Sequence, residues 1–155
     1  GNTTERKGFD IFLQTAALIP ECEFIWAGKK ENYYDEAIEK NGNPSNFIFL
    51  GSLNAEQLSG VYSLADIYLM CSRFDTLPST ILEALLFGTP VIGAKNSGGI
   101  VDIIDSDNGF LTETADSKQF AEAIKVGLTR NYKIEEIDGS FAEYVAYVLS
   151  LYEDE

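Results

Sequence analysis

The sequence predicts an α/β fold in which helices cover both faces of a doubly wound parallel sheet. Two observations lead to this prediction. Short apolar segments typical of strands alternate along the chain with longer segments whose apolar residues recur at helical spacing. The strand-like segments also lack the apolar–polar alternation of a half-exposed sheet, so we expect both of their faces to be buried.

The first half of the chain follows this alternation closely. Apolar residues recur at helical spacing from residue 7 until Pro20 ends the pattern, and Asn54 is a suitable N-cap for a later helix. The helices are expected at residues 7–19, 31–42 and 54–65. The strands are expected at residues 22–28, 46–51 and 67–72.

The second half continues in the same way. Helices are expected at residues 79–88, 98–104 and 116–128, the middle one being short. Extended segments are expected at residues 90–94 and 107–111, and a last amphipathic helix at residues 140–153. Because no linker or internal repeat interrupts the pattern, residues 1–155 are predicted to form a single domain. A doubly wound domain normally begins with a strand, whereas only GNTTER precedes the first helix, so we expect a fragment that lacks an N-terminal domain.

The charge of the chain narrows its possible partners. With 25 acidic and 11 basic residues, its formal net charge is −14, which argues against binding to nucleic acid or an anionic bilayer. No apolar run approaches the roughly 20 residues of a membrane span. Cys22 and Cys71 lie in apolar segments and are expected to be buried free thiols, with a disulfide as the less favoured alternative. These features predict a cytoplasmic location.

The absence of histidine excludes several chemistries. Without it, Ser-His-Asp and Cys-His catalysis and most zinc sites are ruled out. Neither a GxGxxG fingerprint nor a P-loop occurs. We therefore looked for weaker phosphate sites at the carboxyl ends of the expected strands, where open α/β sheets bind their ligands.

The stretch RFDTLPSTILE, residues 73–83, contains such a site. It places Asp75 just after an expected strand and Glu83 inside the next helix, where a carboxylate needs either a ligand or a buried ion pair. That helix is expected to start near Pro78 and Ser79, so its free amides favour an anion in the crevice. A second site is expected at residues 97–99, where paired glycines permit close approach to a ligand, or else only a turn.

Several segments, in order and at suitable spacing, resemble a known family. They are RKGFD, FIWAG, NFIFLGSL, LADIYLMCSRFDTLPSTILEALLFGTPVIGAKNSGGIVDII and NGFL. Over residues 6–125 the chain is similar to the C-terminal, nucleotide-sugar-binding domain of GT-B glycosyltransferases of family GT4. The resemblance implies a Rossmann-like sheet that forms the C-terminal half of a GT-B fold.

The resemblance also implies roles for individual residues. The E-x7-E motif of the family corresponds to Asp75 and Glu83, so that Glu83 binds the ribose hydroxyls and Asp75 faces the donor sugar at the reacting carbon. Lys7 matches the lysine that neutralises the diphosphate, which makes Asp75 and Lys7 the expected catalytic pair. Together with Glu83, the expected substrate-binding residues are Leu77, Ser79, Thr80, Gly51, Leu53, Gly98 and Gly99.

The sequence departs from the family in three places. Asp75 replaces the first glutamate of the motif, Pro78 removes a backbone donor, and the family arginine upstream of Lys7 has no counterpart. Less specific interpretations remain for Asp75 as a turn residue and for Lys7 as a surface lysine.

The implied function is that of a retaining glycosyltransferase. It would transfer a hexose from a UDP- or GDP-sugar to a saccharide or lipid-linked acceptor held by the missing domain, in polysaccharide biosynthesis. The isolated domain would be inactive, and neither a metal nor another cofactor is expected. The full-length protein could lie at the inner face of the membrane. One alternative is a non-catalytic nucleotide-sugar-binding or structural domain. Another is a GT-B epimerase, although these enzymes usually need histidines.

Overall fold

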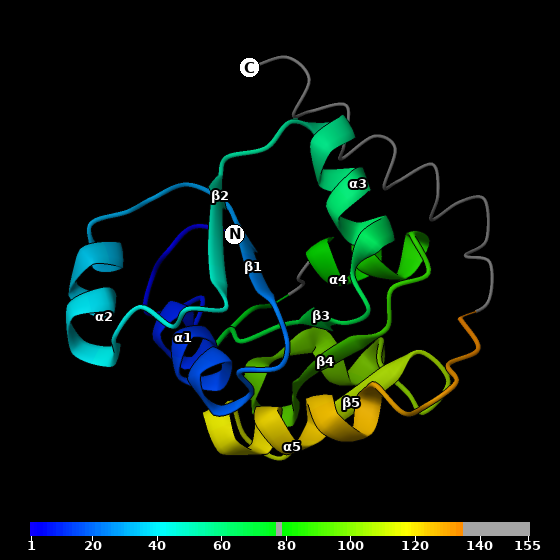
Figure 1. The fold of residues 1–155 in the computed structure, drawn as a ribbon. Coiled ribbons are helices and arrows are strands. Elements are labelled where there is room, and N and C mark those ends of the chain that lie inside the picture. Colours follow the sequence, from blue (N-terminus) through cyan, green and yellow to red (C-terminus); the bar gives the residue numbers. More distant parts are fainter. Residues whose placement is uncertain (77–78, 135–155) are drawn as a thin grey trace.

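The computed structural model describes residues 1–76 and 79–134, and these form alternating strands and helices (Figure 1). The helices are α1 (Phe9–Leu18), α2 (Tyr33–Asn41), α3 (Ala55–Leu64), α4 (Ser79–Leu86) and α5 (Ser117–Gly127). The strands are β1 (Phe24–Ala27), β2 (Phe47–Gly51), β3 (Tyr68–Leu69), β4 (Val91–Ala94) and β5 (Gly109–Thr112). The expected short helix at residues 98–104 is a 3₁₀ segment, Gly99–Asp102, and another 3₁₀ segment, Lys95–Ser97, precedes it.

All strand pairs between these elements are parallel. β1 pairs with β2 from Phe24 opposite Phe47 onwards, and β4 lies between β3 and β5 in a second group. Each crossover between paired strands contains a helical segment, as parallel pairing requires. The carboxyl ends of the strands in each group therefore meet at one edge, and this arrangement positions the candidate site.

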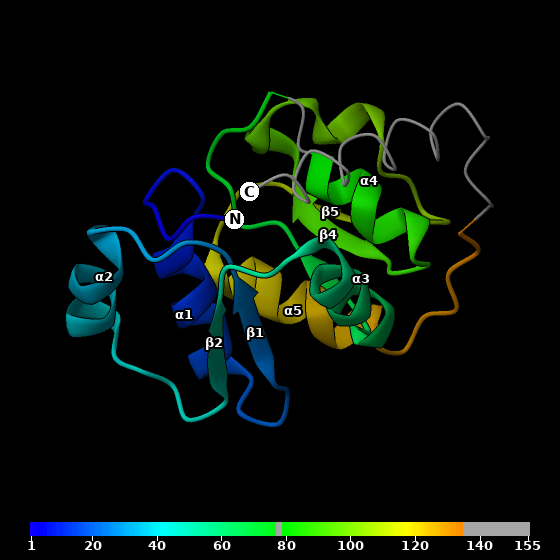
Figure 2. The same cartoon turned by 90° about the horizontal axis from the view of Figure 1, so that it is seen from above.

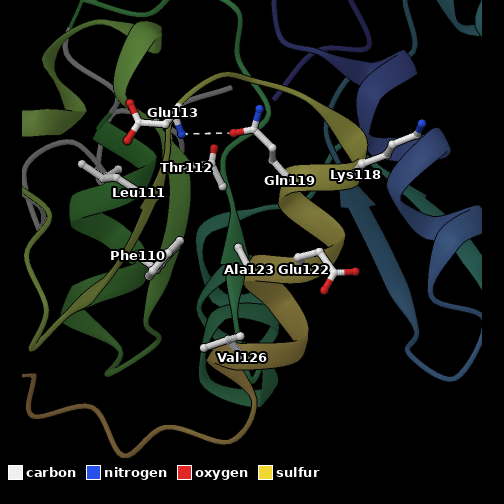
Figure 3. A pocket seen from close by; sticks show the side chains of 9 residues that line it. All are labelled: Phe110, Leu111, Thr112, Glu113, Lys118, Gln119, Glu122, Ala123 and Val126. Carbon is white, nitrogen blue, oxygen red and sulfur yellow. Dashed lines mark hydrogen bonds between the residues drawn. The ribbon is translucent and has the colours of Figure 1, made fainter.

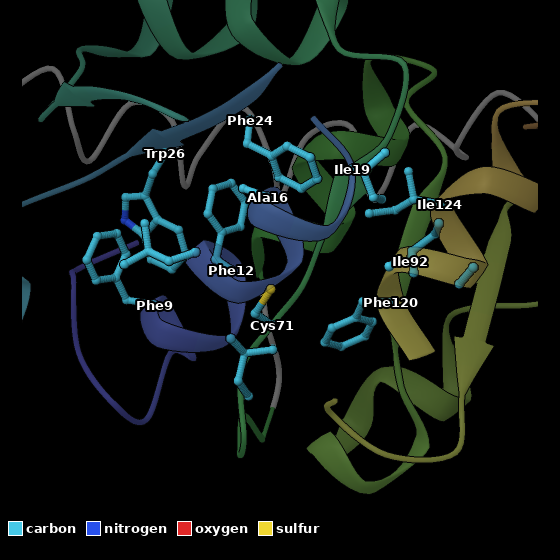
Figure 4. Close-up of a cluster of buried hydrophobic side chains, with 14 of the residues drawn as sticks. Phe9, Phe12, Ala16, Ile19, Phe24, Trp26, Cys71, Ile92, Phe120 and Ile124 are labelled. Atoms are coloured by element: carbon cyan, nitrogen blue, oxygen red, sulfur yellow. The ribbon is translucent and has the colours of Figure 1, made fainter. Parts of the chain in front are cut away.

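One face of the strands is covered by α1, α2 and α5. Phe9 and Phe12 of α1 pack edge-on against Trp26 of β1, with ring centroids 5.0 Å apart in both pairs. The same buried cluster contains Ile92 of β4 and Phe120 of α5, so a single apolar core joins the two groups of strands (Figure 4). Cys71 lies in this core as a free thiol, whereas Cys22 is only half-buried.

The opposite face is covered by α3, α4 and the 3₁₀ segment Gly99–Asp102 (Figure 2). Its buried cluster contains Tyr62 of α3, Ile81 and Leu85 of α4, Val91 of β4 and Ile100. Helical segments thus cover both faces of the group of strands that contains β4. The predicted doubly wound α/β architecture is confirmed.

The expectation that every strand is buried on both faces is wrong for β1 and β2. All residues of β4 are buried, but burial alternates along the other two strands. Ile25, Ile48 and Leu50 remain 44%, 39% and 42% exposed. The reason is that Phe24, Trp26 and Phe47 face the cluster formed with α1, so the residues that alternate with them lie on the opposite face of these two strands. The predicted helix at residues 140–153 lies outside the described residues.

Helix boundaries agree with the sequence pattern to within a few residues. Asn54 caps α3 as predicted, and its side chain and that of Gln57 form a reciprocal capping box with the backbone. Asp116 caps α5 by accepting from the amides of Lys118 and Gln119. The third strand is shorter than expected and spans only Tyr68–Leu69.

Candidate functional site

The candidate site begins with the segment at residues 1–8, which crosses the carboxyl ends of β1 and β3. The amide of Thr3 donates to the carbonyl of Lys29 at 3.0 Å, just beyond β1. Gly8 has a φ of +71°, and a Cβ there would lie 2.0 Å from the carbonyl oxygen of Cys71, just beyond β3. Only glycine permits this approach, which brings Lys7 to the edge of the sheet.

An ion pair fixes the same segment from the other side. Arg73, in the loop after β3, donates two parallel hydrogen bonds to the carboxylate of Asp10 in α1, at 2.7 and 2.8 Å. The Arg73 guanidinium also donates to the carbonyl of Glu5 at 2.6 Å, and its amide donates to the carbonyl of Arg6 at 2.9 Å. Four hydrogen bonds from one residue therefore hold the backbone on either side of Lys7.

Lys7 and Asp75, the expected catalytic pair, are in direct contact. The ammonium group of Lys7 forms an ion pair with the Asp75 carboxylate, whose side chain is only 12% exposed. Arg6 lies beside them, with its guanidinium 3.9 Å from the same carboxylate oxygen. Two cations thus surround Asp75, so in this structure its charge is neutralised by the lysine expected to meet a diphosphate.

Gly98 and Gly99 approach the backbone of the Asp75 loop. The amide of Asp75 donates to the carbonyl of Ser97 at 2.7 Å, and that of Gly99 donates to the carbonyl of Asp75 at 3.3 Å. A Cβ at Gly98 would lie 2.2 Å from the Asp75 carbonyl oxygen, and one at Gly99 would lie 2.3 Å from that of Thr76. The paired glycines therefore position Asp75, and the Gly99 amide is already used within the chain.

Glu83 is buried in α4 with a single side-chain partner among the described residues. It is 2% exposed, and its Oε2 accepts a hydrogen bond of 2.9 Å from the hydroxyl of Tyr62 in α3. No ion pair to Glu83 is found in residues 1–76 and 79–134. The sequence predicted that a ligand or a cation would be the partner of this buried carboxylate, and the structure shows a tyrosine hydroxyl in contact with it.

The start of α4 lies where the sequence predicted it, at Ser79. The hydroxyl of Thr80 accepts a hydrogen bond of 2.8 Å from Tyr68 of β3. Burial raises the pKa of Tyr68, the hydrogen bond to Thr80 opposes this, and the charges of Glu83 and Asp75 raise the pKa further. Both carboxylates of the motif therefore act on the same phenol.

Gly1 lies at the carboxyl end of β1. Its amino group donates to the carbonyl of Ala27 at the end of β1, at 2.7 Å. Burial and, to a smaller extent, the charge of Lys7 lower the pKa of this amine to about 6, and the charge of Glu83 partly opposes them.

The remaining expected site residues are placed less closely. Gly51 ends β2, with a φ of +73°, and its carbonyl accepts from the amide of Gly28 at 2.7 Å. This contact joins the carboxyl ends of β1 and β2 and turns the chain toward Leu53, which is half-buried. Leu77 lies outside the described residues.

A measurable cavity lies elsewhere, along β5 and α5 (Figure 3). It has a volume of about 460 Å³ and is lined mainly by apolar atoms of residues such as Phe110, Ala123 and Val126. It contains none of the expected site residues. We therefore place the candidate site at the strand edge, on the evidence of the converging charges.

Sequence reasoning missed the residues that hold the site together. Tyr62, Arg73 and Asp10 each contact either an expected site residue or the segment that carries one. The ion pair between Arg73 and Asp10 could have been suspected from the sequence, because each lies within three residues of an expected catalytic residue and their charges are opposite. The contact of Tyr62 could not, since its distance in sequence from Glu83 says nothing about contact between two helices.

Comparison with known proteins identifies the family. The sequence profile of the glycosyl transferases group 1 matches residues 1–138. The chain belongs to the group 1 glycosyltransferases. Within this family it is 30% identical over 146 residues to sulfoquinovosyl transferase of Arabidopsis thaliana, covering 92% of the chain and 28% of that protein.

Two further similarities concern one more relative and one solved structure. The chain is 34% identical over 98 residues to alpha-galactosylglucosyldiacylglycerol synthase of Streptococcus pneumoniae, covering 59% of the chain and 26% of that protein. Its fold is similar to that of Anabaena HepE in complex with UDP, with a TM-score of 0.73 and 22% identity over 98% of the chain and 43% of that protein. HepE has also been solved with UDP-glucose.

These comparisons settle the fold class. The chain forms a Rossmann-like half of a GT-B glycosyltransferase, as the sequence predicted. It spans about a quarter of the length of the two curated relatives above. Within the described residues, no helix combines the length and apolarity needed to span a membrane, and no group of three potential metal ligands is found.

Proposed function

We propose that this group 1 chain is the donor-binding domain, the C-terminal half, of a retaining glycosyltransferase similar to family GT4. It would transfer a hexose from a UDP-sugar, or alternatively a GDP-sugar, to a saccharide or lipid-linked acceptor. The observation that carries this proposal is the pairing of Lys7 with Asp75 beyond the carboxyl end of β3, in the loop that leads to α4, the helix that contains Glu83. Open α/β folds bind nucleotides at the carboxyl ends of their strands.

Glu83 is the proposed ribose ligand. Its Oε2 is bound by Tyr62, and its Oε1 has no hydrogen-bond partner among the described residues. Two ribose hydroxyls would supply charge-assisted hydrogen bonds to this carboxylate. UDP is the first nucleotide to test, because the structurally similar HepE binds it.

Lys7 and the start of α4 are the proposed diphosphate ligands. An ammonium group has three donors, so Lys7 can contact a phosphate oxygen while it keeps its ion pair with Asp75. The amides of Ser79 and Thr80 at the start of α4 add a partial positive charge. These groups would stabilise the leaving diphosphate in the role that a metal ion has in other transferases, so we propose metal-independent transfer.

Asp75 is the proposed catalytic carboxylate. It lies in the loop between β3 and α4, before the helix start that would hold the diphosphate, and we place it on the side of the sugar. As the diphosphate leaves, positive charge develops on the reacting carbon, and a carboxylate there stabilises it. Retention of the anomeric configuration is proposed from the resemblance of the motif to family GT4.

The acceptor would be held by an N-terminal domain outside this chain. A lipid-linked acceptor is supported by the relative named as a glucosyldiacylglycerol synthase, and a role in polysaccharide biosynthesis is the companion proposal. The whole protein would act in the cytoplasm, at the inner face of the membrane. The chain alone would bind nucleotide and transfer nothing.

Calorimetric titration of the 155-residue chain with UDP, GDP and ADP tests the nucleotide site. We expect one of the three to bind, and at a hundredfold its dissociation constant to stabilise the fold by about 2.7 kcal/mol. The matched variant is Glu83→Gln, which keeps the side-chain volume but should weaken binding about 10- to 100-fold. Absence of heat and of any melting shift with all three nucleotides at millimolar concentration would contradict the proposal.

A transfer assay separates the enzyme from the alternative. The natural protein that contains this chain should release UDP or GDP from a nucleotide hexose when an acceptor is present. Nucleotide-sugar binding without turnover in that protein would favour a non-catalytic binding domain. The ion pair between Lys7 and Asp75 is the feature that would explain such an outcome, because it already neutralises the proposed catalytic carboxylate.

A further inference from the structure

Tyr62 is a buried aromatic residue on α3 whose hydroxyl reaches the neighbouring helix α4. It donates a hydrogen bond of 2.9 Å to Oε2 of Glu83, and the two residues are 5% and 2% exposed. The surrounding cluster consists of apolar residues such as Met70, Ile81 and Ile100. In such surroundings a carboxylate is stable only if it is hydrogen-bonded, and Tyr62 supplies the donor.

The position of the Tyr62 hydroxyl is set by the packing of its ring and backbone. The ring stacks on Phe87, with centroids 6.0 Å apart and planes 8° apart. The ring of Tyr68 packs edge-on against the ring of Tyr62, with centroids 5.8 Å apart and planes at 65°. The carbonyl of Tyr62 accepts a hydrogen bond of 2.6 Å from the hydroxyl of buried Thr89. Three neighbours therefore hold the donor that meets Glu83.

The hydrogen bond also orients the Glu83 carboxylate. A glutamate side chain has three rotatable bonds, and fixing one oxygen removes most of that freedom. With Oε2 bound to Tyr62 of α3, Oε1 would be the oxygen that accepts from a ligand. A carboxylate held in one orientation binds a ribose more tightly than a free one, because less entropy is lost on binding.

We propose that Tyr62 is a positioning residue for the nucleotide, which holds the Glu83 carboxylate so that Oε1 meets the ribose hydroxyls. This inference rests on the proposed function of Glu83. It goes further in assigning to α3, a helix outside the motif, part of the selection of ribose over deoxyribose.

Tyr68 provides a matched control. It is a partly buried tyrosine that also donates from outside α4 to a side chain of that helix, at 2.8 Å, but its acceptor is the neutral hydroxyl of Thr80. Removing either hydroxyl should disturb folding to a similar extent. Only the removal of the Tyr62 hydroxyl should change the preference of the protein for ribose over 2′-deoxyribose in the nucleotide.

The test compares the affinities of the 155-residue chain for UDP and 2′-deoxy-UDP by calorimetry. Wild-type protein should prefer UDP by about tenfold or more, the effect of a hydrogen bond to a charged group. Tyr62→Phe should reduce this preference to within about threefold by weakening UDP binding, with little change for 2′-deoxy-UDP. Tyr68→Phe should keep the wild-type preference.

Two non-natural residues at position 62 guard against a folding defect in Tyr62→Phe. A 4-fluorophenylalanine fills the space of the hydroxyl but donates no hydrogen bond, and it should lose the preference. A 4-aminophenylalanine retains a donor, and it should keep the preference. A full preference in Tyr62→Phe or in the fluorinated protein would overturn the positioning role alone. Failure of wild-type protein to bind UDP, GDP or ADP would instead contradict the proposed function on which it rests.

Discussion

Arg73 and Asp10 connect the loop after β3 to helix α1 through a two-point ion pair, with N–O distances of 2.7 and 2.8 Å. Asp10 is largely buried, whereas Arg73 is partly exposed. The same guanidinium holds the carbonyl of Glu5. Arg73 and Asp10 are 63 residues apart in the sequence. Their ion pair, together with the hydrogen bond to Glu5, fixes the segment that carries Lys7.

The first prediction concerns acid stability. Burial alone would raise the pKa of Asp10, but the hydrogen bond and the charge of Arg73 outweigh it and lower the pKa below its ordinary value. A depressed carboxyl pKa contributes stability above the unfolded pKa of about 4, and this stability is lost as the pH falls through the folded pKa. Asp10→Asn should therefore reduce the free energy of unfolding by about 2 kcal/mol at pH 7, and by progressively less below pH 4.

Urea titrations at several pH values measure this difference. Asp35→Asn is the matched control, because Asp35 pairs with Lys30 at 2.8 Å but its side chain is 77% exposed. That variant should change stability by less than about 0.5 kcal/mol at any pH. An Asp10→Asn effect of the same size at pH 7 and pH 3 would show that the ion pair is not its cause.

The second prediction concerns the close approach of Gly98 to the Asp75 loop. Gly98 has a φ of +107°, and an added Cβ would lie 2.2 Å from a backbone oxygen that cannot move without the loop. Gly98→Ala should therefore cost about 2–4 kcal/mol of stability through strain and overlap. Gly60→Ala, within α3 and with open space around it, should stabilise by up to about 1 kcal/mol. Thermal unfolding of both variants checks this, and a Gly98→Ala protein as stable as wild type would refute the close packing.

The third prediction isolates the diphosphate contact of Lys7. Lys7→Gln should weaken UDP binding about 10- to 100-fold, because it removes a charge-assisted hydrogen bond to phosphate. Uridine, which has no phosphate, should bind the variant and the wild type alike. Lys30→Gln removes an exposed lysine and should affect neither ligand. If Lys7→Gln weakened uridine and UDP to the same extent, the lysine would act through the fold and not through the diphosphate.

Sequence reasoning succeeded where local patterns suffice. The cap at Asn54, the helix start at Ser79 and the order of the five described strands all follow from spacing and turn residues. It failed for the exposure of Ile25 and Ile48, because which face of a strand is covered by helices depends on the packing of distant segments. The same limit applies to the candidate site.

The pattern RFDTLPSTILE identified the two carboxylates but not their partners. Lys7 was expected to meet a diphosphate, and the structure shows that it also neutralises Asp75. Glu83 was expected to need a ligand or a cation, and the partner in the structure is the hydroxyl of Tyr62. These contacts join α4 and the Asp75 loop to segments remote in sequence, and no local pattern encodes them.

The last prediction concerns Asp75 in the natural protein that contains this chain. Asp75→Asn should reduce turnover by at least about a hundredfold, the usual effect of losing one electrostatic contact to developing charge. UDP affinity should change by less than about threefold, because the proposed nucleotide contacts come from Lys7, Glu83 and the start of α4. The loss of the ion pair even frees Lys7 for the phosphates, which opposes any weakening of binding.

Two measurements on the same samples give the outcome: UDP release from a UDP-hexose that the wild-type protein accepts, and calorimetric binding of UDP. Asp75→Glu, which restores the residue of the E-x7-E motif, is the control and should retain part of the activity, because its carboxylate still faces the sugar. Turnover by Asp75→Asn within a few-fold of wild type would mean that the carboxylate serves only its ion pair with Lys7. In that case the domain would bind the donor without taking part in the chemistry, and the catalytic group would have to come from outside this chain.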